Sequence, residues 1–507
     1  METLPSEIFH MIIFDNLLEP TGENHPIFPT YLKRDFLNLR LVDRMWNALI
    51  VNDSRYWSRI DITTPGSLQW ARVLLSRAAQ ATLSLSLRPS RIKAKGLEDY
   101  LYKWNCHLEA VDFILPLLPR CHQLSISLPP EYLSHALDTL GSGVSAPVLH
   151  TLIVANTKYQ DPAEAYEVSC LRPFRAVSQP LFNSHLPSLR DVTLRDIGHV
   201  WSDALPFPIP LHRAKNLWLS FSPDRWGSPT SLSVAQLSSI IQHSLSLLSL
   251  AIYGVQELDV TRLCQSAHLQ TVIISGPTRL NFLNFDLPQH TITTLSLEGV
   301  AVTGLHPGAV VRGLACLPAL QKLTLNIDDL TFDEEQVSAP PVGLTLPNLK
   351  ELRISKQRSF HLFVLGSLSF PRLTHLTLDN SDFSDWTPNP NWPLIESMNP
   401  ITSLSALHIN YNGCDTPRLS LLVSKMPNLY TLGCAVDALK LGIQWPLQEE
   451  SPFGQGIMCR HLKEIVLPRN VKRSDGLEAL ILCRKEWASK GICAELVCTT
   501  PSHPKLS

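Results

Sequence analysis

The sequence predicts a repeat protein of the α/β class, in which a solenoid of parallel strands follows a small all-α module. Three observations support this prediction. A phrase of apolar residues spaced as apolar-x-x-apolar-x-apolar recurs along most of the chain, and two N-terminal segments have helical periodicity. The chain of 507 residues also exceeds one ordinary compact domain, as a repeat array would.

The N-terminal segments predict two helices followed by a short turn. Thr3 is a suitable N-cap for a helix over residues 4–18, and Pro5 and Glu7 fall in its first turn. A second helix over residues 36–50 carries an apolar stripe at helical spacing: Leu39, Val42, Trp46 and Leu49. Helices of this size cannot bury all their apolar surface among themselves, so we expect a partner protein to cover the remainder.

The recurring phrase predicts one strand per repeat. The last two apolar residues of each copy, at i and i+2, would point into a core, and one unit cannot bury that face alone, so neighbours must stack. The copies are Cys121/Leu124/Ile126, Leu149/Leu152/Val154, Leu189/Val192/Leu194, Ala214/Leu217/Leu219, Leu245/Leu248/Leu250, Leu269/Val272/Ile274, Ile292/Leu295/Leu297, Leu320/Leu323/Leu325, Leu349/Leu352/Ile354, Leu373/Leu376/Leu378, Leu404/Leu407/Ile409, Leu429/Leu432/Cys434 and Leu462/Ile465/Leu467.

From the Leu245 copy to the Leu462 copy the first residues of the phrase lie 23 to 33 residues apart. Most of these steps fit the leucine-rich-repeat period of about 20–29 residues, and the longer ones indicate loop insertions. The region from Leu83 to Leu467 therefore resembles leucine-rich repeats, which implies a horseshoe-shaped solenoid. It departs from that family because the Asn or Cys that closes each strand turn is mostly missing. The alternative is an irregular α/β domain with coincidental copies of the motif.

Residues 3–62 resemble an F-box. The resemblance is carried by Leu-Pro-x-Glu-Ile from Leu4, Leu-Arg-Leu-Val-x-Arg-x-Trp-x-x-Leu-Ile from Leu39, and Tyr-Trp-x-x-Ile from Tyr56. In that family the module docks on the Skp adaptor of an SCF-type cullin ubiquitin ligase. The insertion Glu19–Arg34 departs from the family pattern. The resemblance implies these adaptor-binding residues: Leu4, Pro5, Ile8, Ile12, Leu41, Val42, Trp46 and Leu49. The alternative is an ordinary N-terminal helical cap of the solenoid.

These patterns set the predicted domain boundaries. The helical module covers residues 1–62, and a linker segment with a helix over Ser67–Ala79 covers 63–82. The solenoid covers 83–473 and opens with a strand at Leu83–Leu87. Residues 474–507 form a cap and tail, with a helix over Ser474–Ser489 and a strand over Ile492–Val497.

A binding surface is predicted from the alternation of side chains along each strand. Residues beside the core positions should point outward onto the concave face of the horseshoe. The predicted substrate-binding residues are Trp218, Glu298, Lys322, Glu351, Arg353, His375, Asp379 and His408. Both signs of charge and an aromatic residue are present, as protein-binding surfaces often have, but a merely solvated sheet face would look the same.

Composition excludes several classes of partner. The net charge of −2 gives no basic footprint for nucleic acid or an anionic membrane. We see no signal peptide and no run of about 18 apolar residues, so no membrane span is expected. The 11 cysteines include no Cys-x-x-Cys pair, which favours reduced thiols in the cytoplasm or nucleus and no metal site.

No catalytic constellation is present in the sequence. It contains no Gly-x-Ser-x-Gly, no phosphate-binding glycine-rich loop and no His-Glu-x-x-His. We therefore expect a protein that is not an enzyme and that needs no cofactor. Its expected partners are the Skp adaptor, a cullin bound through that adaptor, and an unknown protein substrate. The alternative is a non-catalytic leucine-rich-repeat scaffold whose N-terminal helices only cap the solenoid.

Overall fold

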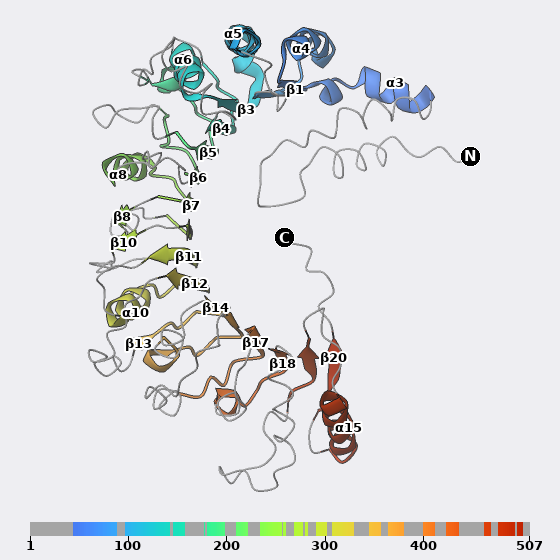
Figure 1. Cartoon of the computed structure of the whole chain (residues 1–507), viewed down its shortest axis with the longest axis vertical. Coiled ribbons are helices and arrows are strands. Elements are labelled where there is room, and N and C mark those ends of the chain that lie inside the picture. The colour runs from blue at the N-terminus through green and yellow to red at the C-terminus, as the bar shows by residue number, and fades with distance from the viewer. Residues whose placement is uncertain are drawn as a thin grey trace. The chain divides into compact units, whose positions relative to one another are not determined.

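The chain is a mixed α/β protein dominated by a long parallel sheet, compatible with a solenoid-like fold (Figure 1). The structure, a computed structural model, describes residues 44–88, 97–141, 145–157, 177, 180–197, 209–221, 234–255, 257–259, 268–276, 279–281, 291–301, 307–328, 344–355, 364–379, 399–410, 422–434, 461–467, 475–491 and 494–499. Residues 1–43, which carry most of the predicted helical module, lie outside this set. The chain divides into two compact units: the first consists of Met1–Asp191, His199–Pro210 and Ser502–Ser507, and the second of Val192–Gly198 and Leu211–Pro501.

The first unit alternates helices with parallel strands. Strands β1 to β4 pair in chain order, and their core residues Ile60, Leu85, Leu124 and Leu152 are neighbours in register. The elements are α3 (Arg44–Asn52), η2 (Ser54–Trp57), β1 (Arg59–Ile62), α4 (Pro65–Ala78), β2 (Leu83–Leu87), α5 (Leu97–Ile114), η3 (Leu115–Arg120), β3 (Cys121–Leu128), α6 (Pro130–Gly141), β4 (Thr151–Asn156) and η4 (Leu181–Ser184).

The predicted linker helix is α4, which begins two residues earlier than expected. Its start is fixed by a capping box, in which Thr64 Oγ1 accepts a hydrogen bond from the Ser67 N–H and Ser67 Oγ accepts one from the Thr64 N–H. Pro65 takes the first helical position, where its missing N–H is no loss. The helix buries Leu68, Ala71, Leu74 and Ala78 along one face.

The strand β1 lies inside the range assigned to the helical module. Ile60 and Ile62 are buried on one face, whereas Asp61 points away and pairs with Arg88 at 2.8 Å. This strand pairs in parallel with β2, the strand predicted to open the solenoid. The sheet therefore begins at Arg59, before the predicted boundary at Leu83.

The second unit carries most of the repeats. Its elements are β5 (Asp191–Arg195, from Val192 on), β6 (Asn216–Ser220), α8 (Val234–His243), β7 (Ser249–Tyr253), β8 (Glu257–Asp259), β9 (Thr271–Ser275), β10 (Arg279–Asn281), β11 (Thr294–Ala301), α10 (Pro307–Ala315), β12 (Lys322–Asp328), β13 (Leu344–Thr345), β14 (Glu351–Ser355), β15 (Leu368–Ser369), β16 (His375–Asp379), β17 (Ala406–Asn410), β18 (Thr431–Cys434), β19 (Glu464–Val466), α15 (Asp475–Ser489) and β20 (Val497–Thr499).

The strands of the second unit pair in parallel in the order β6, β7, β9, β11, β12, β14, β16, β17, β18, β19 and β20. Their first core positions form one ladder: Leu217, Leu250, Val272, Leu295, Leu323, Leu352, Leu376, Leu407, Leu432 and Ile465. Each of these side chains is at most 6% exposed. The ladder confirms the middle apolar position of the recurring phrase on these strands, with one exception.

The exception is the copy predicted at Leu245/Leu248/Leu250. Leu245 is 70% exposed, and the buried residues are Leu247, Leu250 and Ile252. The prediction was therefore wrong by two residues at this repeat. At the end of α8 the Ser244 Oγ donates to the Ile240 carbonyl at 2.6 Å. The turn that follows, in which the Leu247 N–H donates to the Ser244 carbonyl at 3.2 Å, brings Leu247 into the core.

The C-terminal helix was predicted correctly to within one residue, and it is α15. The final strand was predicted over Ile492–Val497 but begins only at Val497. It pairs with β19 from Glu464 opposite Val497 to Val466 opposite Thr499. No helix in the described part of the chain is long and apolar enough to span a membrane.

Candidate functional site

Two surfaces are candidates for binding, and the first is a face of helix α3. Trp46 and Leu49, both predicted to contact an adaptor, lie on this helix and are half-buried. The other predicted contacts lie outside the described residues: Leu4, Pro5, Ile8, Ile12, Leu41 and Val42.

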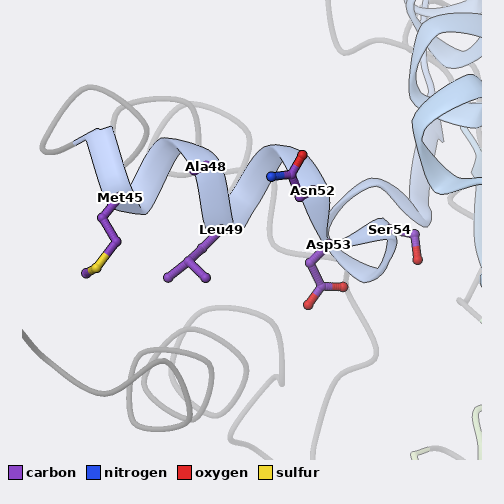
Figure 2. A pocket seen from close by; sticks show the side chains of 6 residues that line it. All are labelled: Met45, Ala48, Leu49, Asn52, Asp53 and Ser54. Atoms are coloured by element: carbon purple, nitrogen blue, oxygen red, sulfur yellow. The ribbon is translucent and has the colours of Figure 1, made fainter.

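A pocket of about 460 Å³ opens beside α3 and η2. Figure 2 shows Met45 and Leu49 projecting from the same side of the helix, as their i, i+4 spacing requires. The described residues that line it are Met45, Ala48, Leu49, Asn52, Asp53 and Ser54. Leu49 therefore lines this pocket and Trp46 does not. The pocket combines an apolar wall with a polar end, which suits an apolar side chain of a partner protein.

The Tyr-Trp pair of the predicted turn anchors α3 to the rest of the first unit. The Trp57 indole is 1% exposed, and its Nε1–H donates to the Ile50 carbonyl at 2.9 Å, satisfying a carbonyl at the end of α3. The guanidinium of Arg77 on α4 lies 4.5 Å from the centre of the Trp57 ring. Trp57 thus fixes the orientation of α3 relative to α4 from inside the core.

The second surface consists of the strand side chains that alternate with the core positions, and we call it the outward face. The eight predicted substrate-binding residues all occupy such alternating positions on their strands. Of these, Glu298, Lys322, Glu351, Arg353 and His375 are exposed, whereas Trp218, Asp379 and His408 are half-buried. All eight lie on strands of the second unit.

Two ion pairs cross neighbouring strands of the outward face. Lys322 Nζ lies 2.9 Å from Glu351 Oε1, and these residues are direct register partners on β12 and β14. Arg353 Nε donates to Asp379 Oδ2 at 2.7 Å from β14 to β16. The lysine and arginine side chains are both more than half exposed. Exposed pairs of this kind contribute only about 0–1 kcal/mol, so a charged ligand can replace one partner at little cost.

A glycine makes room for His408 on this face. Gly433 is the register partner of His408 on β18, and a Cβ at position 433 would overlap the imidazole ring. The pKa of His408 is lowered, first by burial and then by the neighbouring His375, although Glu464 and Asp379 oppose the shift. His408 is therefore neutral near pH 7 and can both donate and accept a hydrogen bond.

The N-terminal end of the outward face in the second unit is aromatic. The rings of Trp218 on β6 and Tyr253 on β7 stack with centroids 5.0 Å apart and planes inclined by 18°. Sequence reasoning found Trp218 but missed Tyr253, because the register error at Leu245 ended the strand before this residue. The alternation Leu250-Ala251-Ile252 was the signal that could have found it.

The described residues contain no group of three or more His, Cys, Asp or Glu side chains that could hold a metal ion. Burial raises the pKa of the Cys121 thiol to about 12, so this cysteine is not a thiolate nucleophile at neutral pH. Comparison with known proteins adds no family assignment, since no protein-family model matches the chain and no curated protein matches its sequence.

Proposed function

We propose that this protein is the substrate-recognition subunit of an SCF-type ubiquitin ligase. In this role the N-terminal helices dock the Skp adaptor, which brings a cullin, and the outward face binds a protein substrate. The protein itself performs no chemistry. It raises the effective concentration of the substrate near the ubiquitin-charged enzyme that the cullin recruits.

The observation that carries the proposal is the apolar wall of α3. Met45 and Leu49 line a pocket and are not part of the buried core of the chain. An apolar wall on a helix that is anchored by Trp57 is a suitable docking surface for another helical protein. The F-box resemblance of residues 3–62 gives the identity of the expected partner.

A second function is favoured by a different observation. The Trp57–Ile50 hydrogen bond and the pairing of β1 with β2 fasten α3 and η2 to the first strands, as a solenoid cap would be fastened. On this alternative the protein is a repeat scaffold that binds other proteins without any link to a ubiquitin ligase.

Affinity purification of the full-length protein distinguishes the two functions. A substrate-recognition subunit retains the Skp adaptor and a cullin, and Leu49→Asp should greatly reduce both. Val73→Asp is the matched control, because Val73 is an apolar residue of α4 that is 40% exposed and lies away from the pocket lining. Failure of the wild-type protein to retain either partner would exclude the ligase function and leave the scaffold.

A further inference from the structure

We propose that Tyr253 and Glu298 form a subsite for one basic side chain, Lys or Arg, of a protein ligand. The inference deepens the proposed function, because under that function the ligand would be the substrate. The subsite itself is a binding property of the outward face and does not depend on an adaptor.

The strand register brings the two residues to opposite sides of a serine. Tyr253 on β7 pairs with Ser275 on β9, which pairs with Glu298 on β11. Adjacent strands lie about 4.8 Å apart, so the backbones at Tyr253 and Glu298 are separated by about 10 Å. Ser275 is small and fills little of the space above the sheet. One ammonium or guanidinium group fits between the ring and the carboxylate.

The aromatic side of the subsite is held in place by Trp218. Trp218 lies on β6, and its ring stacks on Tyr253 from that side. The opposite face of the Tyr253 ring is consequently the one directed towards Ser275 and Glu298. The negative electrostatic potential of an aromatic face attracts cations. Ile273, at the neighbouring outward position, is half-buried and adds apolar surface beside it.

The acidic side of the subsite is a carboxylate without a cation among the described residues. Glu298 is exposed, and Oε1 accepts a hydrogen bond from the Ser296 hydroxyl at 2.8 Å. Glu351 and Asp379 on the same face each have a Lys or Arg within 3 Å. Glu298 has no such ion pair among the described residues, and its exposed carboxylate can pair with an incoming Lys or Arg.

The pKa shift of the Tyr253 hydroxyl is consistent with a position near Glu298. Its pKa is raised, first by burial and then by the negative charge of Glu298. The phenol therefore stays neutral at physiological pH, and its ring remains a surface for a cation rather than becoming an anion.

The test is a peptide selection on the full-length protein. A phage-displayed library of random dodecapeptides is selected on the wild-type protein and on Glu298→Gln, Tyr253→Leu and Glu486→Gln. We expect the wild-type protein to enrich Arg and Lys over the starting library. The best peptide should bind about three- to tenfold more weakly to Glu298→Gln and to Tyr253→Leu, as loss of one exposed charge or cation–π contact predicts.

Glu486→Gln is the matched control, because this exposed carboxylate lies on α15, outside the outward face, and is already paired with Lys490 at 2.6 Å. It should bind the peptide within about twofold of the wild-type protein. If Tyr253→Leu does not fold, Glu298→Gln decides the result, and Tyr253→Phe should bind normally. Enrichment of acidic or purely apolar peptides, selection of no peptide, or unchanged affinity in Glu298→Gln would overturn the proposal.

The outcome is separable from that of the proposed function. The selection uses the protein without an adaptor, so a protein that never binds the Skp adaptor still shows the Arg and Lys preference if the subsite exists. Conversely, Glu298→Gln should retain the adaptor as well as the wild-type protein does.

Discussion

At the scale of single residues, burial decides the charge of His107. This side chain lies on α5 and is 2% exposed, and burial lowers the pKa of its imidazole to about 4. In the unfolded chain the imidazole has its ordinary pKa of about 6.5. Between these two values the unfolded chain binds a proton that the folded protein does not.

We therefore expect acidification to destabilise the protein through His107. Because the pKa is depressed by folding, this contribution to stability is complete above about pH 6.5 and is lost as the pH falls towards 4. A shift of this size corresponds to a loss on the order of 3 kcal/mol. Thermal melting of the wild-type protein and of His107→Leu from pH 7 to 4 measures it. Parallel pH profiles of the two proteins would contradict the prediction.

At the scale of the strand, the alternation of apolar and polar residues determines which side chains are buried. Leu376 is fully buried and lies in register between Leu352 and Leu407. Thr377, the next residue, occupies the outward face beside Arg353 and His408. Two adjacent residues thus have opposite environments.

A charge at these two positions should have very different effects. Leu376→Asp places an unpaired charge in a core shared by three strands and should cost about 3 kcal/mol or more of unfolding free energy. Thr377→Asp lies on the outward face and should change the unfolding free energy by no more than about 0.5 kcal/mol. Denaturant titration of both variants checks this, and equal destabilisation would mean that the register of β16 is wrong.

The sequence predicted the ladder well because each strand carries its own signal. It failed where that signal was ambiguous. The segment 245–252 fits the phrase in two registers, Leu245/Leu248/Leu250 and Leu247/Leu250/Ile252. The hydrogen bond from Ser244 to Ile240 at the end of α8 is invisible in a pattern of apolar residues. The same error removed Tyr253 from the predicted outward face.

The strand β1 escaped prediction for a different reason. Only four residues long, it alternates the charged residues Arg59 and Asp61 with two isoleucines. Its pairing is supported by the ion pair of Asp61 with Arg88, which lies 27 residues further along the chain. Contacts of this range come from the tertiary fold, and no local spacing indicates them.

At the scale of the whole molecule, the two candidate surfaces belong to different compact units. The pocket beside α3 is in the first unit, and the predicted outward residues from Trp218 to His408 are in the second. Each unit buries its own ladder of apolar side chains. Substitutions in one surface that share no partner with the other are expected to act independently.

This independence gives the adaptor proposal a direct test at the N-terminus. Leu4 and Pro5, which the F-box resemblance implies as adaptor contacts, lie outside the described residues. Loss of an apolar anchor from such an interface typically costs about 1–4 kcal/mol, or roughly tenfold to a thousandfold in affinity. We predict that the double variant Leu4→Ala, Pro5→Ala loses adaptor binding to this extent in a titration with the purified Skp adaptor.

The same double variant should leave the strand ladders intact, because their core residues contact one another along the sheet and depend on no adaptor. Its melting temperature and its peptide selection on the outward face should therefore match those of the wild-type protein. Undiminished adaptor binding would contradict the docking role of these two residues. A large fall in melting temperature would instead favour the scaffold, since residues that only cap a solenoid protect its first strands and their loss exposes that core.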